Sequence, residues 1–478
     1  MKITARAVAT TLALSWLAVC LAGCANPPHR ESVVPALPPL TQAGPGAPNI
    51  VIIVADDLGY REVGSAGNAV IRTPNLDRLA AQGMRFDKAF VPTAMCSPSR
   101  AALYSGLYPH RNGLFRNHGQ AKAGTRSIPH YFSALGYRVA LAGKVHVGPP
   151  QSFPFELIDL DAESIERFLD ADAAHPFVLV IAQHFPHVPW VANRIYDPET
   201  LQLPAKSVDT PQTRAAFGRY YASVTSGDEE LGRIMRLMDA KGLSSSTITV
   251  FLSDHGAQFP FMKFSNYEAG LRVPLIFRWP GVIQPGASSG ALVSSVDILP
   301  TLIDMAGGSA PAGLDGRSFL PVLRGVSVAH RDAVFGAQST AGLDVENADP
   351  YGIRSVRTER FRYIRNLHPG NKQKTLITEP RPLRGSIRYL MEFGAWVPPG
   401  VPAYWQSWQL AATRDEHARN IVRAYWDRPA EELYDLDADP DELSNLAGAP
   451  QHEKVLVQMR SRLDAWMRAQ GDTGADAG

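Results

Sequence analysis

The stretch Asn49-Ile50-Val51-Ile52-Ile53-Val54-Ala55 decides the fold, because it is a continuous apolar run rich in β-branched residues. Such a run is typical of a strand that is buried on both faces of a parallel sheet. Helical patterns separate further runs of this kind, at residues 136–142, 177–182, 247–252 and 273–277. This alternation predicts an α/β fold, in which helices flank a mostly parallel sheet.

Polar residues follow directly after four of these apolar runs. They are Asp56 and Asp57, Lys144 and His146, His184 and His187, and Asp254 and His255. Any one of them alone is more often a turn or scaffold residue than a functional one. Ligands of open α/β sheets, however, bind outside the carboxyl ends of the strands. The joint pattern therefore predicts that separate segments bring their chemistry to one edge of the sheet.

A second stretch, Met95-Cys96-Ser97-Pro98-Ser99-Arg100-Ala101-Ala102-Leu103, predicts a pocket for an anion. Cys96 stands one residue before the expected start of a helix, which Ser97 or Ser99 could cap. The free N–H groups at a helix start bind anions, and Arg100 could add a guanidinium one turn later. These residues indicate a nucleophile in an oxyanion pocket and leave the anion open.

The composition narrows the class of ligand. With 478 residues the chain can bury a large core, and length alone suggests more than one compact unit. The net charge is +1, so the chain has no global field that would attract nucleic acid or an anionic membrane. An anionic substrate must therefore be bound by a local cluster of cations.

The pattern of predicted strands changes after about residue 330. Short runs that resemble antiparallel strands lie at residues 333–336, 351–357, 361–364 and 431–436. Residues 367–408 are rich in proline and aromatic residues and are expected to be irregular, and a closing helix is expected over residues 453–467. We therefore predict a catalytic domain over residues 49–330 and a smaller C-terminal α+β subdomain over residues 331–478.

The N-terminus has the pattern of a targeting segment. Lys2 and Arg6 precede an apolar run over residues 7–21, which is too short for a comfortable membrane span. The run ends in Leu21-Ala22-Gly23-Cys24, which resembles the lipobox of bacterial lipoproteins. We expect a signal peptide over residues 1–23, a lipid on Cys24 and a disordered tether over residues 24–48. The alternative is ordinary signal cleavage nearby, with Cys24 incidental.

This interpretation predicts an exported bacterial protein, anchored by lipid in the periplasm or the outer membrane. Cys20 would leave with the signal peptide and Cys24 would carry the lipid, so Cys96 would be the cysteine left in the mature chain. It would have no disulfide partner there, and a lone thiol in an exported protein is exposed to oxidation. Cys96 is therefore either buried and inert or consumed by chemistry.

The run Cys96-Ser97-Pro98-Ser99-Arg100, followed by Ala-Ala-Leu-Tyr-Ser-Gly, resembles the signature C-x-P-S-R-x-x-L-x-T/S-G of the type I sulfatases. These enzymes belong to the alkaline phosphatase superfamily, so the resemblance implies an alkaline-phosphatase-like fold. It also implies that a formylglycine-generating enzyme converts Cys96 to formylglycine, whose hydrated aldehyde attacks sulfur. A lone exported thiol would then be explained, because the working group is no longer a thiol.

The resemblance also implies a role for each polar residue at the sheet edge. The expected ligands of one divalent cation, calcium in most of the family, are Asp56, Asp57, Asp254, His255 and the modified Cys96. Arg100 would orient the formylglycine hydrate, and His146 would be the base that releases sulfate. The groups that would hold the sulfate oxygens are Lys144, His187 and Lys263. His255 departs from the family, which mostly has Asn there, and imidazole is a softer ligand.

Within the family the flanking segments resemble the heparan N-sulfatases, or sulfamidases. The similar segments are Gly143-Lys144-Val145-His146-Val147-Gly148-Pro149 and residues 258–261, 334–339, 353–357 and 426–445. His255 and Lys263 depart from that branch, which has Asn and Arg at these positions. The implied partner is a sulfated carbohydrate, with N-sulfoglucosamine of heparan-type glycans as the leading substrate. The alternatives are an O-sulfatase on another sugar, a phosphonate or phosphate monoester hydrolase, and an anchored glycan-binding lipoprotein.

Overall fold

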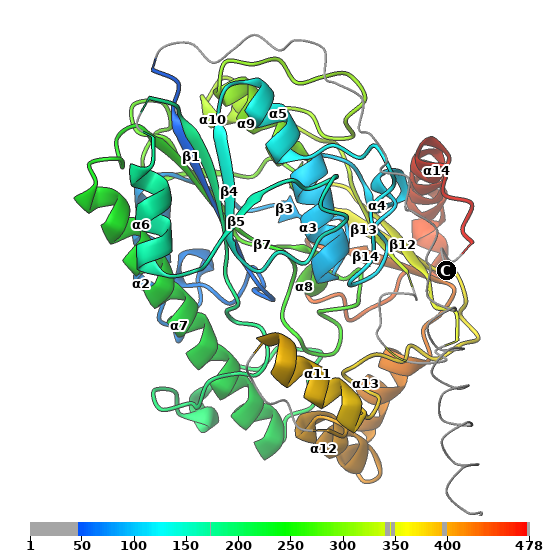
Figure 1. Ribbon diagram of the computed structural model, residues 1–478. Coiled ribbons are helices and arrows are strands. Elements are labelled where there is room, and N and C mark those ends of the chain that lie inside the picture. Colours follow the sequence, from blue (N-terminus) through cyan, green and yellow to red (C-terminus); the bar gives the residue numbers. More distant parts are fainter. Residues whose placement is uncertain (1–45, 173, 340–344, 346–348, 394–398, 476–478) are drawn as a thin grey trace, which may run out of the picture.

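The computed structural model describes residues 46–475, apart from 173, 340–344, 346–348 and 394–398 (Figure 1). The predicted signal peptide, Cys24 and most of the predicted tether lie outside the described residues. Within the described part of the chain, no helix combines the length and apolarity needed to cross a membrane.

An eight-stranded sheet forms the centre of the molecule, with the strand order β5-β4-β6-β1-β7-β8-β2-β9. The strands are β1 (Asn49–Ala55), β2 (Met84–Phe86), β4 (Arg138–Gly143), β5 (Glu156–Ile158), β6 (Phe177–Ala182), β7 (Thr247–Ser253), β8 (Leu275–Arg278) and β9 (Ala287–Ser289). Strand β1 lies between β6 and β7 and pairs with both in parallel. Strand β8 runs antiparallel to its neighbours β7 and β2. The predicted α/β fold with a mostly parallel sheet is confirmed.

Helices cover both faces of this sheet (Figure 1). Val51 and Ile53 of β1 belong to a core cluster with α2 (Pro74–Gln82), α6 (Ala162–Asp170) and α7 (Pro211–Ala240). The alternate residues Ile50 and Ile52 belong to a cluster on the other face. That face is covered by α3 (Cys96–Ser105), α5 (Ile128–Ala134), α9 (Ile298–Met305) and α10 (Leu320–Leu323). Both faces of β1 are buried from Ile50 to Ala55, which accounts for the continuous apolar sequence of these residues.

The second layer of the molecule is a four-stranded antiparallel sheet near the C-terminus. Its strands, in spatial order, are β11 (Val334–Gln338), β12 (Ile353–Arg357), β13 (Phe361–Asn366) and β14 (Glu431–Asp435). The closing helix α14 (Glu453–Gln470) packs its Leu456, Met459 and Leu463 with Tyr363 of β13 in one cluster. The predicted C-terminal strands and closing helix are confirmed, whereas the domain boundary at residue 330 stays a prediction.

The expectation that residues 367–408 are irregular is wrong for part of this range. Three helices occupy much of this region and the segment that follows it, namely α11 (Leu383–Phe393), α12 (Ala403–Ala412) and α13 (Glu416–Trp426). Aromatic residues of this stretch are core residues, since Trp405 and Trp408 are fully buried. Trp408 also donates from Nε1 to Thr213 Oγ1 of α7 at 2.7 Å. Tertiary burial therefore overrides the weak local helix signal.

Shorter elements complete the chain between these layers. They are β3 (Ala89–Phe90) and β10 (Val293–Ser294), which pair in parallel, and the short helices α4 (Pro109–Asn112) and α8 (Glu268–Leu271).

Candidate active site

The register of the central strands brings the acidic residues together. Ala55, the last residue of β1, pairs with Ser253, the last residue of β7. The two strands therefore end side by side, and just beyond them the backbone N–H of Asp57 donates to Asp254 Oδ1 at 3.1 Å. Asp57 has a φ of 69°, so the chain turns sharply as it leaves the sheet. These carboxylates are both buried at the predicted sheet edge.

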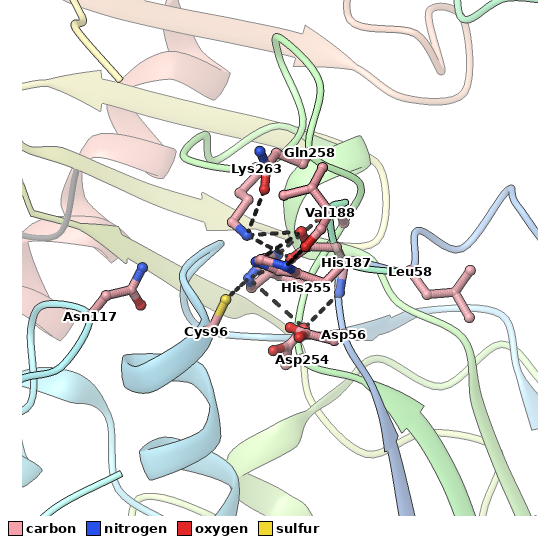
Figure 2. Close-up of polar contacts among 12 residues, drawn as sticks. Asp56, Leu58, Cys96, Asn117, His187, Val188, Asp254, His255, Gln258 and Lys263 are labelled. Carbon is pink, nitrogen blue, oxygen red and sulfur yellow. Dashed lines mark hydrogen bonds and ion pairs between the residues drawn. The ribbon is translucent and has the colours of Figure 1, made fainter. Parts of the chain in front are cut away.

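Cys96 lies at the start of α3, 1% exposed, and faces His255 (Figure 2). The His255 Nε2 atom is 3.2 Å from Cys96 Sγ, and its Nδ1 atom lies 2.9 Å from the carbonyl oxygen of Gly256. Nε2 is also 3.4 Å from Asp57 Oδ1. One imidazole thus joins the predicted nucleophile to the predicted metal ligands.

The expected helix start is wrong by one residue, and neither serine caps it. Helix α3 begins at Cys96 itself, after Met95 as N-cap, which makes no side-chain hydrogen bond. The backbone N–H of Ser97 instead donates to Asn117 Oδ1 at 3.1 Å, and Ser99 Oγ donates to the Asp254 carbonyl at 2.6 Å. A distant loop supplies the cap, and the serine hydroxyl ties α3 to the end of β7.

Each buried carboxylate at this edge has a cationic partner. Lys144 Nζ donates to Asp56 Oδ2 at 2.6 Å. Lys263 Nζ donates to both oxygens of Asp57, at 2.8 and 2.9 Å. Arg100 Nε donates to Asp254 Oδ2 at 3.0 Å. Removing either partner of such a pair leaves an uncompensated buried charge, so these residues stabilise one another.

These contacts change the protonation of the site. Although burial opposes it, the charges of Lys144, His187 and Arg100 hold the pKa of Asp56 well below its usual 3.8. Burial raises the pKa of Asp57. Burial disfavours protonated His255, but Asp254, the Cys96 sulfur and Asp57 outweigh it and raise the pKa of this histidine to about 9. The site is therefore built to hold negative charge on oxygen beside several cations.

The two other predicted histidines lie at the margin of this cluster. His187 Nε2 is 3.9 Å from Asp57 Oδ2, and its Nδ1 is 2.7 Å from the carbonyl oxygen of Val188. His146 has a φ of 47°, and neither of its buried ring nitrogens has a hydrogen-bond partner among the described residues. Burial, with the neighbouring Lys144, holds the pKa of His146 well below 6.5. A neutral His146 can accept a proton, as a general base must.

The donor set fits a hard divalent cation. Ligand atoms of Asp56, Asp57, Cys96 and His187, and those of Cys96, Asp254 and His255, lie within 4.8 Å of one another in each group. Asp56 Oδ1 is buried and has no hydrogen-bond partner among the described residues, so it is available to a metal. Three carboxylates are the donors that calcium and magnesium prefer. The structure thus contains a candidate metal site beside Cys96.

Sequence reasoning missed several residues that support the site. Asn117 Oδ1 accepts from the Ser97 N–H. Gln258 Oε1 accepts from Lys263 Nζ at 3.4 Å. The ring of His118 lies 4.5 Å from that of His146, centroid to centroid. Ser253 Oγ accepts from the Leu58 N–H at 2.9 Å. Gln258 lies in the family-like segment 258–261 but was given no role there, and only the folded chain identifies the roles of these residues.

Comparisons with known proteins agree with this geometry. The sulfatase family model matches residues 48–157 and 154–309, and the model of the N-sulphoglucosamine sulphohydrolase C-terminal region matches residues 256–376. The chain is 32% identical over 448 residues to an ulvan-active sulfatase of Formosa agariphila, covering 89% of this chain and 81% of that protein. It is 29% identical over 473 residues to human N-sulphoglucosamine sulphohydrolase, covering 87% and 89% of the two chains.

Solved structures share the fold at lower identity. An enzyme in complex with its substrate D-glucosamine-2-N,6-O-disulfate aligns with a TM-score of 0.67 at 19% identity, covering 90% of this chain and 99% of that one. The phosphonate monoester hydrolase of Agrobacterium radiobacter aligns with a TM-score of 0.64 at 21% identity, covering 88% and 96%.

The fold and the cluster around Cys96 define a hydrolase of the alkaline phosphatase superfamily, and the chain belongs to its sulfatase family. Within that family it carries the C-terminal region of the N-sulphoglucosamine sulphohydrolases, and it acts on sulfated sugars or glycans.

Proposed function

We propose that this protein removes sulfate from a sulfated sugar through an oxygen nucleophile made from Cys96. N-sulfoglucosamine of heparan-type glycans is the leading substrate. The observation that carries the proposal is the position of Cys96 Sγ, 3.2 Å from His255 Nε2 within the buried cluster of carboxylates and cations. A free thiol placed there would have no evident use, whereas a formylglycine hydrate would supply an oxygen that attacks sulfur.

Asp56, Asp57, Asp254 and His255 would hold a divalent cation together with the modified Cys96. When bound, this cation would polarise oxygen and stabilise negative charge. Calcium is the proposed ion because three of the four side chains offer carboxylates, which suit a hard cation. Two observations support the ligand set: the proximity of these atoms, and the buried Asp56 Oδ1, which has no hydrogen-bond partner among the described residues.

The surrounding cations bind and orient the sulfate group. The ammonium groups of Lys144 and Lys263 touch the carboxylates of Asp56 and Asp57, so both lie beside the position of the nucleophile. Donors of this kind stabilise charge that develops on the sulfate oxygens in the transition state. Arg100 is fully buried between Asp254 and Asp56 and positions the first turn of α3.

His146 acts as the base at the margin of the site. Its pKa is held low by burial and by Lys144, so the ring is neutral at pH 7. It would take the proton of the hydroxyl on residue 96 when sulfate leaves, which regenerates the aldehyde by elimination. No attacking water is then required.

Two findings favour a sulfamate substrate. The sulphohydrolase C-terminal model matches residues 256–376, which contain Lys263 and β11 to β13, and the human relative in that family is 29% identical. The test is a panel of glucosamines that carry a single N-, 2-O-, 3-O- or 6-O-sulfate. We expect the highest kcat/KM for the N-sulfated sugar. Preference for any O-sulfated member would reject the sulfamate assignment.

A second candidate, an O-sulfatase on another glycan, is favoured by the 32% identity to an ulvan-active sulfatase. Ulvan oligosaccharides in the same panel distinguish the two candidates. An aryl phosphate and an aryl phosphonate test for hydrolysis of phosphorus esters. A preparation that binds glycans but turns over no substrate would support the glycan-binding alternative.

The maturation of Cys96 has its own test. A formylglycine-generating enzyme in the host would convert the thiol to an aldehyde, and peptide mass spectrometry would detect the change. Cys96→Ala should abolish turnover and leave glycan binding intact. Turnover that survives this substitution, or a fully active preparation that retains the thiol, would contradict the proposal.

Export and lipid anchoring remain proposals from the sequence. The lipobox-like Leu21-Ala22-Gly23-Cys24 supports a bacterial lipoprotein of the periplasm or the outer membrane. Metabolic labelling with a fatty acid should label the wild type, and Cys24→Ala should remove the label. Labelling that is unchanged in the variant would reject Cys24 as the anchor.

A further inference from the structure

A cavity lies outside the cluster of residues around Cys96. Its volume is about 530 Å³, which is within the range of small-molecule sites. Segments 60–62 and 66–70, 202–207, 260–262, 267–269 with residue 272, and 440–442 line it. None of the predicted catalytic or metal-binding residues is among them. Ala69, Gln202 and Ala205 are exposed, so the cavity opens to solvent at this rim.

An ammonium group is held in this cavity by aromatic rings. Lys206 Nζ lies 3.6 Å from the ring centroid of Tyr267, 5.2 Å from that of Tyr434 and 5.5 Å from that of Phe261. Among the described residues it has no hydrogen-bond acceptor and no ion-pair partner. Rings attract a cation without using its N–H donors. All the donors of Lys206 are therefore available to a ligand.

The other arginine and acidic side chains of the cavity are already paired. Arg61 binds Asp441, and Glu268 binds Arg362. Glu442 lies 3.0 Å from Arg362 Nε and accepts from the Glu268 N–H at 2.9 Å. The contacts of Glu268 and Glu442 tie the cavity wall to Arg362 of strand β13, and Glu442 also acts electrostatically on Lys206.

Glu62 is the carboxyl group that remains in the cavity. It is 8% exposed, and its side chain makes no hydrogen bond with another described side chain. Burial raises the pKa of Glu62 to about 7. At neutral pH such a group can either donate to or accept from a hydroxyl. The cavity thus offers a cation for an anionic group and a carboxyl for a hydroxyl.

We propose that this cavity binds an acidic sugar residue of the glycan substrate. The carboxylate or sulfate of that sugar would form an ion pair with Lys206 Nζ. One of its hydroxyl groups would form a hydrogen bond with the Glu62 carboxyl. The inference rests on the proposed function, because it takes the substrate to be a sulfated saccharide. It adds a second contact with the same glycan, away from the sulfur.

Two elements connect the cavity to the cysteine site. Phe261 and Met262 line the cavity, and the next residue, Lys263, binds Asp57. Tyr221 of α7 also lines the cavity, and its neighbour Tyr220 donates to the Asp57 carbonyl at 3.0 Å. The cavity is therefore next to the site along two separate stretches of chain.

The binding test uses Lys206→Met, with Lys372→Met as its control. Lys372 also lies near an aromatic ring, 5.2 Å from the Trp426 centroid, but outside the cavity. Calorimetry measures the Kd of a desulfated tetrasaccharide that contains uronate residues, of its carboxyl-reduced counterpart, and of inorganic sulfate. We expect Lys206→Met to raise the Kd of the uronate tetrasaccharide at least tenfold, and we expect the control variant to leave this Kd unchanged. The carboxyl-reduced form should bind the wild type at least tenfold more weakly.

Equal affinity of all three proteins for the uronate tetrasaccharide would overturn the inference. So would a loss in Lys206→Met that affects inorganic sulfate alone, since that result describes a site for a small free anion. If Lys206→Met does not fold, Glu62→Gln tests the same cavity, with an expected loss of at least threefold.

A kinetic arm separates this inference from the proposed function. In Lys206→Met, the KM for a sulfated tetrasaccharide should rise at least fivefold more than the KM for the sulfated monosaccharide. Equal changes in the two KM values would overturn the inference. The calorimetric arm needs no turnover, so a binding difference without any sulfatase activity would reject the proposed function and retain the cavity assignment.

Discussion

At the scale of single residues, the site depends on charges that are buried together. Arg100 is 0% exposed and lies 3.0 Å from Asp254 and 3.5 Å from Asp56. Arg100→Met would leave both carboxylates without this cation, so we expect the free energy of unfolding to fall by about 3–5 kcal/mol. Urea unfolding measures it, with the exposed Arg78→Met as control. A loss below about 1 kcal/mol would mean that water or relaxation compensates the charge.

A second residue-scale prediction concerns Glu62 and pH. Its pKa is about 7 in the folded protein, above the ordinary 4.5, so the folded state holds a proton that the unfolded state has released. Stability from this group is present below pH 4.5 and is lost as pH rises through 7. The difference in free energy of unfolding between Glu62→Gln and the wild type should therefore be about 2–3 kcal/mol more favourable to the variant at pH 8 than at pH 4.

Thermal or urea unfolding at the two pH values checks this gain. The exposed Glu229→Gln serves as control, because it makes the same change of side chain at the protein surface. A pH-independent effect of Glu62→Gln would show that its carboxyl titrates normally.

At the scale of elements, α12 shows how burial creates a helix that its sequence hides. The Trp408 side chain is 0% exposed, and its Nε1 donates to Thr213 Oγ1 of α7. Trp408→Ala should destabilise the protein by about 3–5 kcal/mol through the cavity that it leaves. Leu410 on the same helix is 60% exposed, so Leu410→Ala should change stability by less than about 0.5 kcal/mol. Similar losses for the two variants would contradict this packing.

The same scale shows which predictions succeeded. Strand β6 was predictable to the residue, because six consecutive apolar residues can be buried on both faces of a parallel sheet. The ends of helix α2 coincide with Pro74 and Gly83, which are local start and stop signals of a helix. The start of α3 was not predictable, since its cap is Asn117 from a separate loop. The sequence predicts the ends of an element well when the residues that cap it are adjacent to it in the chain.

At the scale of the whole molecule, the metal should couple the site to global stability. Its proposed ligands come from β1, α3 and the end of β7, so a bound cation joins segments that are distant in sequence. A ligand present at 100 times its Kd adds about 2.7 kcal/mol to folding. Treatment with a chelator should therefore lower Tm, and calcium should restore it more fully than magnesium.

Differential scanning calorimetry measures this change. Asp56→Asn should reduce the response of Tm to calcium, whereas Asp172→Asn, at a partly exposed position outside the site, should not. An unchanged Tm after chelation would contradict a metal held at this site.

The sequence by itself determined the α/β class, the order of the polar segments and the family signature at Cys96. These are local properties, because strand burial and the cysteine motif are each written in consecutive residues. Only the tertiary structure decided that Lys144, Lys263 and Arg100 pair with the buried aspartates, that Asn117 caps α3, and that Lys206 lies among aromatic rings. Such contacts depend on strand register and side-chain direction, which bring together residues that are far apart along the chain.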